Sequence, residues 1–256
     1  MREARLPVNA YILPPIAIAL GIAAWALLSR LHLFPESSFP SPYAVLIGFA
    51  EEYWHGLPDN IIASVFRVGA GFLIAVLVGV PLGLWLGLNN RARLALLPIV
   101  NFFRSLSPLA WIPFAILWFG LGDKPTIFLI FMASVFPLTL ATIAGVASIP
   151  AVTFRVARDY GISGLGLLTE VTLPAIAPDV ITAMRVTAGL AWVVVVAAEM
   201  LSGKDGLGFA IWDARNGLRM DLLVVNMVVI GIIGVLLDRL LMQLTRIPSV
   251  RWGYEQ

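Results

Sequence analysis

The sequence predicts an all-α membrane protein with about six transmembrane helices. Of its 256 residues, 60% are hydrophobic and only 12% are charged, and its mean hydropathy of +0.93 is far above that of an ordinary soluble domain. Six apolar runs approach or exceed the roughly 20 residues that an α-helix needs to cross about 30 Å of hydrocarbon. These runs cover roughly residues 10–29, 61–88, 94–119, 125–147, 178–201 and 222–242.

The first run has a signal peptide as its alternative interpretation, because Arg2 and Arg5 precede it. Its apolar part, from about Ala10 to Ser29, is longer than the roughly 7–15 residues of a signal-peptide core. We therefore interpret it as a retained first span.

The charges between the runs predict that both chain ends are cytoplasmic. The inner segments would hold Arg2, Arg5, Arg91, Arg93, Arg155, Arg158, Arg239, Arg246 and Arg251. The outer segments would hold only Arg30, Lys124, Lys204, Arg215 and Arg219, among acidic residues. Since cytoplasmic segments carry the excess of Lys and Arg, the N-in, C-in orientation is favoured.

Residues 1–60 are predicted to form the first span and a periplasmic interfacial helix. Pro35, Pro40 and Pro42 break the chain before the segment 43–54, in which apolar residues recur at helical spacing. That pattern is typical of an amphipathic helix at a membrane surface, and a folded periplasmic loop is the alternative.

The second and third runs carry helix-packing and helix-bending signals. Small residues stand at every fourth position of the second run, at Gly71, Ala75, Gly79, Gly83 and Gly87, which predicts close approach of a neighbouring helix. Prolines cluster in or near the third run, at Pro98, Pro108 and Pro113. Prolines kink helices and free carbonyl groups, so the third span is predicted to line a pathway.

The segment 150–176 is a long polar insert within the predicted core of residues 61–245, which a tail of residues 246–256 follows. We expect two short helices there, with Gly161 providing the turn and Pro174 ending the second helix. The insert is interpreted as a cytoplasmic docking loop. A helix that merely lies on lipid is the alternative.

Several classes of chemistry have no support in the sequence. There is no cysteine, no Gly-x-x-x-x-Gly-Lys-Ser/Thr phosphate-binding loop and no His/Glu spacing typical of a metal site. The net charge of +2 does not indicate a nucleic-acid partner. The chain is therefore predicted to be neither an ATPase nor another enzyme.

The insert resembles the "EAA" loop of ABC importer permeases. That pattern is Glu-Ala-Ala, three residues, Gly, nine residues, then Ile-x-Leu-Pro. Ala157, Gly161, Leu173 and Pro174 match it at the same spacing, with Val171 for the isoleucine. Arg155 and Val156 depart from it, standing where the pattern has Glu and Ala.

Residues from about 60 to 240 also resemble the nitrate, bicarbonate, taurine and alkanesulfonate importer permeases. The segments that carry this similarity are Ser64–Phe72, Val80–Leu84, Phe103–Pro113, Leu117–Gly120 and Gly189–Glu199. The resemblance implies a type I ABC importer permease in a bacterial inner (plasma) membrane that imports a small oxyanion. It implies as partners two ABC ATPase subunits, a periplasmic or lipid-anchored solute-binding protein, membrane lipid and a second permease copy.

The resemblance also implies that no cofactor is held by this chain, since ATP and Mg bind to the partner ATPase. The residues implied for ATPase docking are Ala157, Arg158, Asp159, Gly161, Leu165, Glu170, Leu173 and Pro174.

Arg104 and Glu199 are the ionisable residues placed deepest in predicted spans. A charge in hydrocarbon costs at least roughly 2.5–3.5 kcal/mol on insertion scales, so each requires water or a partner. Arg104, beside Ser107, suits a transient anion site in the translocation pathway with Glu199 orienting it, and a structural ion pair is the alternative. Trp111 is a pathway candidate or an interfacial anchor. Arg67 and Arg185 lie nearer span ends, where we expect snorkelling.

Other functions remain as alternatives. The same class of permease could import a pyrimidine precursor or an aromatic acid. A secondary transporter would show an inverted repeat of broken helices, and an intramembrane enzyme would show a catalytic constellation. Neither pattern is evident in the sequence.

Overall fold

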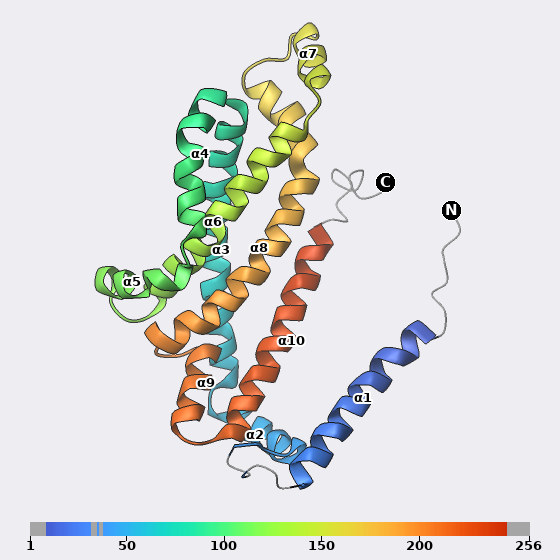
Figure 1. Ribbon diagram of the computed structural model, residues 1–256, viewed down its shortest axis with the longest axis vertical. Coiled ribbons are helices and arrows are strands. Elements are labelled where there is room, and N and C mark those ends of the chain that lie inside the picture. The colour runs from blue at the N-terminus through green and yellow to red at the C-terminus, as the bar shows by residue number, and fades with distance from the viewer. Residues whose placement is uncertain (1–8, 32–34, 36–37, 245–256) are drawn as a thin grey trace. The chain divides into compact units, whose positions relative to one another are not determined.

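The computed structural model describes residues 9–31, 35 and 38–244, and every regular element in these ranges is helical (Figure 1). The elements are α1 (Asn9–Arg30), α2 (Pro42–His55), α3 (Leu57–Leu88), α4 (Asn90–Ser105), η1 (Pro108–Trp111), α5 (Ile112–Phe119), α6 (Asp123–Ser148), α7 (Ala151–Asp159), η2 (Leu167–Thr172), α8 (Leu173–Ser202), α9 (Leu207–Asn216) and α10 (Met220–Leu244). The predicted tail 246–256 and the N-terminal Arg2 and Arg5 lie outside the described residues.

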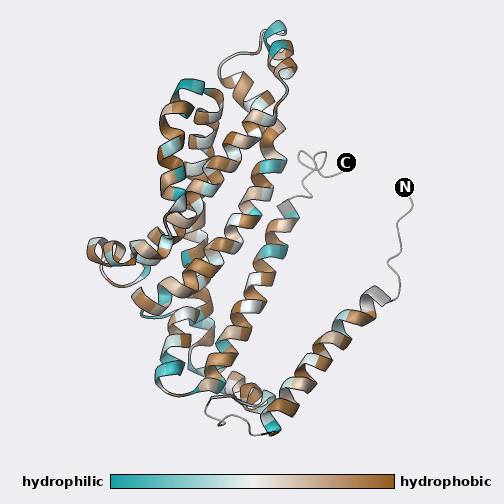
Figure 2. Cartoon of the chain, in the orientation of Figure 1, coloured by the Kyte–Doolittle hydropathy of each residue, from teal (hydrophilic) through white to brown (hydrophobic). Residues whose placement is uncertain are grey.

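Five helical stretches are long and apolar enough to cross a membrane, and hydrophobic residues predominate along them in Figure 2. They are Ile12–Arg30, Leu57–Leu88, Asp123–Ser148, Leu167–Leu201 and Met220–Gln243. A bent pair, Asn90–Ser105 with Pro108–Phe119, makes up to six. The all-α class with about six spans is therefore confirmed.

The third predicted span, residues 94–119, is bent at the predicted proline cluster and not a single straight helix. Its two parts meet at 86°. Leu106 and Ser107 between them have extended backbones, with ψ of 132° and 128°. A residue that precedes proline is pushed out of the helical region, so Pro108 interrupts the helix at this point.

The chain divides into two compact units, residues 1–58 with 210–229, and residues 59–209 with 230–256. In the first unit, the predicted amphipathic helix is present as α2, which begins where the Ser41 hydroxyl accepts a hydrogen bond from the Ala44 N–H at 3.2 Å. The Arg219 guanidinium, in the same unit, forms ion pairs with Glu51 at 2.7 Å and with Asp221 at 2.8 Å. The hydrogen bonds from Arg219 lower the pKa of Glu51. The location of α2 at a membrane surface stays a prediction.

In the second unit, α3 lies against α6 along the predicted stripe of small residues. A Cβ atom added at Gly83 would lie 2.5 Å from the Thr142 Cβ and 2.7 Å from the Thr139 carbonyl oxygen. The Thr139 hydroxyl also donates a 3.2 Å hydrogen bond to the Gly79 carbonyl, across the two helices. The close helix approach predicted from the glycine spacing is thus confirmed.

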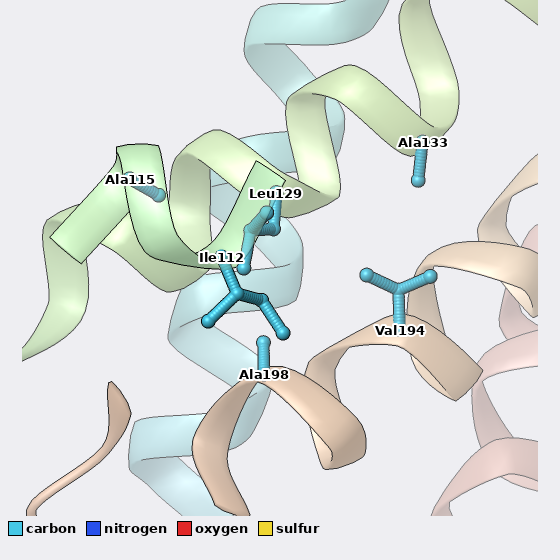
Figure 3. Packing of buried hydrophobic residues seen from close by; sticks show 6 residues of the cluster. All are labelled: Ile112, Ala115, Leu129, Ala133, Val194 and Ala198. Atoms are coloured by element: carbon cyan, nitrogen blue, oxygen red, sulfur yellow. The ribbon is translucent and has the colours of Figure 1, made fainter. Parts of the chain in front are cut away.

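The second arm of the bent pair packs onto α6 and α8. Figure 3 shows the cluster that joins them, with Ile112 and Ala115 from α5, Leu129 and Ala133 from α6, and Val194 and Ala198 from α8. All six are buried. The bend therefore places α5 against the core helices, in the region where the proline cluster predicted a kink.

Gly83→Ala tests the α3–α6 contact. We expect the added methyl group to lower the free energy of unfolding by about 1–3 kcal/mol, because it would overlap backbone and side-chain atoms of α6. Gly69→Ala in the same helix is the matched control, since no atom lies within 4 Å of its added Cβ. The control should leave stability equal or raise it by up to about 1 kcal/mol, as alanine favours a helix. Unfolding followed by circular dichroism in detergent measures both, and equal stabilities for the two variants would contradict the contact.

Candidate functional site

The first half of the candidate docking loop is α7, which ends in a tight turn at Gly161. The Ile162 N–H donates to the Ala157 carbonyl and the Gly161 N–H to the Arg158 carbonyl, both at 2.9 Å. This pair of bonds is a Schellman motif, and Gly161 has the left-handed φ of +77° that the motif requires. The glycine turn predicted from the sequence is therefore present.

The second half of the loop differs from the prediction of a short helix that ends at Pro174. Leu167–Thr172 is a π-helical segment that runs directly into α8, and the Leu173 N–H bonds to the Leu168 carbonyl. Pro174 lies in the first turn of α8 and begins that helix. Because the π-helical segment continues into α8, the missing N–H of Pro174 removes one backbone hydrogen bond to the preceding turn.

Most of the docking residues suggested by the resemblance are exposed. Leu165 is 79% exposed, and Arg158, Asp159, Gly161, Glu170 and Pro174 are exposed as well. Leu173 is half-buried, and Ala157 is only 5% exposed. Ala157 thus serves the inner packing of α7, which lies against η2, while its neighbours present a polar surface.

A cavity of about 340 Å³ lies beside this loop. Thr169, Leu173, Pro174 and Ile176 line it together with Val80 from α3. Because the π-helical segment forms part of the wall, a shift of the loop would change the shape of this cavity.

A second candidate region is a buried polar cluster centred on Arg67. This side chain is 1% exposed, so the predicted snorkelling of Arg67 is wrong. Its Nη1 atom donates to Glu199 at 2.8 Å, its Nε atom donates to Asp123 at 2.7 Å, and its Nη2 atom is paired with Asp205. The Ser64 hydroxyl donates to Glu199 at 2.8 Å.

The cluster also holds the turn between α8 and α9. The Gly206 N–H donates to Asn60 at 2.8 Å, the Leu207 N–H to Ser64 at 2.9 Å and the Gly208 N–H to Glu199 at 3.0 Å. Asn60, Ser64 and Arg67 follow the spacing i, i+4, i+7, which places them on one face of α3. This polar stripe is the sequence signal that could have identified the cluster.

The structure does not bring Arg104 to Glu199. Glu199 is fully buried in the Arg67 cluster, whereas Arg104 is exposed in the last turn of α4. No ion pair of Arg104 occurs within residues 38–244. Ser107 is exposed at the start of η1.

Trp111 is half-buried and lies in an aromatic cluster, with its ring centroid 6.2 Å from that of Phe103 and 6.3 Å from that of Phe128. Trp192 is buried, and its Nε1 atom donates to the Ile230 carbonyl at 3.1 Å. The predicted pathway residues therefore lie in two places, with Arg104, Ser107 and Trp111 around the bend and Glu199 in the buried cluster.

No group of three or more His, Asp or Glu side chains that could hold a metal ion occurs in the part of the chain that the structure describes. The first region presents exposed polar side chains, and the second holds buried ion pairs.

Comparison with known proteins shows one consistent family. Residues 79–247 match the family described as "Binding-protein-dependent transport system inner membrane component". A putative ABC transporter permease, MJ0413 of Methanocaldococcus jannaschii, is 42% identical over 72% of this chain and 69% of its own length. The bicarbonate transport system permease CmpB of Synechococcus elongatus is 38% identical over 75% of this chain and 69% of its own length. The nitrate import permease NrtB of Synechocystis is 34% identical over 89% of this chain and 86% of its own length.

A solved structure of the MetNI methionine ABC transporter, in an inward-facing conformation, has a chain with the same fold. The TM-score is 0.61 with 18% sequence identity, over 74% of this chain and 96% of that one. The type I importer fold expected from the loop motif is therefore confirmed.

Arg67→Met tests the buried cluster. Removing the guanidinium would leave the buried Glu199 carboxylate without its cation, so we expect the free energy of unfolding to fall by about 3–5 kcal/mol. Arg93→Met is the control, because Arg93 is half-buried and bonds only Asn90, a surface contact whose loss should change stability by about 0.5 kcal/mol or less. Chemical unfolding in detergent measures both variants. A loss for Arg67→Met no larger than the loss for Arg93→Met would refute the role of the cluster.

Proposed function

The chain belongs to the binding-protein-dependent transport system inner membrane component family, and from this premise we propose that its importer carries a small oxyanion. Membership makes the chain a multi-pass permease subunit of an ABC importer, which is a transport role and not a catalytic one. A binding-protein-dependent system also includes an ATPase and a solute-binding protein.

One observation supports the solute class. The relatives CmpB and NrtB, which match along most of this chain, are named for bicarbonate and nitrate. Both solutes are small planar oxyanions, whose oxygens a guanidinium group can bind in a bidentate manner. A sulfonate such as taurine presents similar oxygens and belongs to the proposed class.

We propose that the loop 150–176 docks on the ATPase at the cytoplasmic face, with both chain ends on that side of the plasma membrane and with a second copy of this chain as the partner permease. The Schellman turn presents Arg158 and Asp159 outward while Ala157 packs inward against η2. Since η2 continues into α8, a displacement of α7 would pass directly into that span. This connection supports alternating access driven from the loop.

We propose that Arg104, Ser107 and Trp111 face the translocation pathway. Arg104 is exposed beside the 86° bend, where a second permease copy or a water-filled cavity could reach it. Glu199 would act indirectly, because it is buried with Arg67 and would hold the outer end of α8 in place.

Gly161→Val tests the docking assignment. A β-branched residue is strained at φ of +77° by roughly 1–2 kcal/mol, so we expect about fivefold to thirtyfold weaker coupling between ATP hydrolysis and import. Gly166→Ala is the matched control in the same loop, because Gly166 is helical with φ of −60° and its added Cβ makes only ordinary contacts, at 3.5 Å or more.

The measurement is import and ATP turnover by the reconstituted importer, with membrane insertion checked for each variant. Normal import by Gly161→Val would show that the loop does not transmit the movement.

Import by the complete system in proteoliposomes tests the solute class. We expect uptake of nitrate, bicarbonate or taurine by the parental importer, and lower uptake by Arg104→Gln than by Arg104→Lys, because lysine keeps the charge and loses only the guanidinium fork. Arg239→Gln, an exposed arginine of α10, is the control. Uptake of a pyrimidine precursor or an aromatic acid, without any oxyanion, would disprove the proposed class.

A further inference from the structure

A separate cavity of about 220 Å³ lies between α8 and the part of α10 that belongs to the same unit. Its walls include Arg185, Gly189 and Trp192 from α8, and Gly234 and Asp238 from α10. Both helices are candidate membrane spans, and the cavity brings a cation of one beside a carboxylate of the other. Charged residues within membrane spans are rare, and they commonly pair with one another or line a solute pathway.

The guanidinium of Arg185 is only partly satisfied. Its Nη2 atom donates to the two carboxylate oxygens of Asp238 at 3.0 and 3.3 Å. Its Nε–H group is buried and has no acceptor among the described residues. A buried donor without a partner is costly, and the cost is removed when an acceptor enters.

The walls are built in a way that keeps the cavity open. No atom lies within 4 Å of a Cβ added at Gly189, whereas one added at Gly234 would lie 3.1 Å from the Trp192 ring. The Nε1 atom of the same indole donates a 3.1 Å hydrogen bond to the Ile230 carbonyl, one turn earlier on α10. Glycine at 234 therefore lets the ring lie against α10, and glycine at 189 leaves space in front of Arg185.

We propose that this cavity is a transient binding site for a small oxyanion, one of whose oxygens accepts the Arg185 Nε–H. The inference rests on the proposed function for the chemical class of the solute. Asp238 balances the charge of Arg185, so an anion would be held by hydrogen bonding with little net attraction. Conduction requires binding that is favourable enough for entry and weak enough for release, and a neutralised cation meets both conditions.

A purely structural ion pair is the competing interpretation, and Asp238→Asn separates the two. If Arg185 binds the solute, the Asp238 carboxylate competes with the solute for the guanidinium. Removing this carboxylate should then tighten oxyanion binding by roughly tenfold. If the pair is only structural, Asp238→Asn should leave oxyanion binding unchanged and lower the stability of the protein.

The binding experiment uses the permease assembled with its ATPase in detergent, without the binding protein, and nitrate as the probe. The readout is the shift of the unfolding temperature with nitrate concentration, relative to chloride at equal ionic strength. We expect a saturable shift for the parental complex and for Arg239→Gln, no shift for Arg185→Gln, and a roughly tenfold lower half-saturating concentration for Asp238→Asn.

Two further variants test the inference in case a single substitution prevents folding. The double variant Arg185→Met, Asp238→Leu removes both charges together, which is tolerated far better than removal of one. Gly189→Leu adds an apolar side chain to the cavity wall, at a position where no atom lies within 4 Å of the added Cβ. Both should fold and assemble yet show no nitrate-dependent shift.

Transport provides the second readout, measured as maximal import at saturating loaded binding protein. We expect Arg185→Gln and Gly189→Leu to reduce it by roughly tenfold. A nitrate-dependent shift that persists in Arg185→Gln and Gly189→Leu, or import by both at the parental rate, would overturn this inference. Failure of the parental importer to move any oxyanion would instead overturn the proposed function, and the two failures are therefore distinguishable.

Discussion

The guanidinium of Arg67 is the interaction on which the arrangement of the larger unit depends, because it joins α3 to the start of α6, to α8 and to the turn that follows α8. Helices in lipid gain no hydrophobic attraction for one another, so close packing and buried polar contacts decide how they associate. The small residues of α3 supply the close packing, because they let α6 approach. Arg67, in the first half of the same helix, supplies the buried polar contacts, and the two kinds of contact together join α3, α6 and α8.

Local spacing explains what could be predicted from the sequence. The apolar runs predicted four of the six spans within a few residues at both ends, and the end but not the start of the stretch Leu167–Leu201. The small residues at every fourth position predicted the face of α3 that meets α6, and Gly161 predicted a left-handed turn. Each of these features can be recognised within one continuous stretch of sequence. The family resemblance rested on the same kind of information, since the loop motif is a set of short fixed distances along the chain.

Features that depend on distant residues were not predictable in this way. Glu199 lies 132 positions after Arg67, and the apolar runs alone do not select Arg67 over Arg104 as its partner. Composition placed both arginines in apolar runs, but only the polar face formed with Asn60 and Ser64 turns Arg67 inward. Proline clustering indicated a kink in the third span without giving its size, because the 86° bend is stabilised by the packing of Ile112 and Ala115 on α6 and α8. The π-helical start of α8 likewise has no established sequence signal.

Helix α8 connects the regions to which we assign function. Its π-helical beginning lies beside the docking loop, Arg185 lines the small cavity further along, and Glu199 is anchored near its end by Arg67, Ser64 and the Gly208 amide. A helix anchored at one end and displaced at the other cannot slide as a whole, so the displacement must appear as rotation or bending between the two. Well-packed stretches resist such a change, whereas a segment beside a cavity yields more easily. A movement that starts at the docking loop would therefore deform α8 around Arg185. It would change the distance between the Arg185 guanidinium and the Asp238 carboxylate, and so the strength with which an anion is bound.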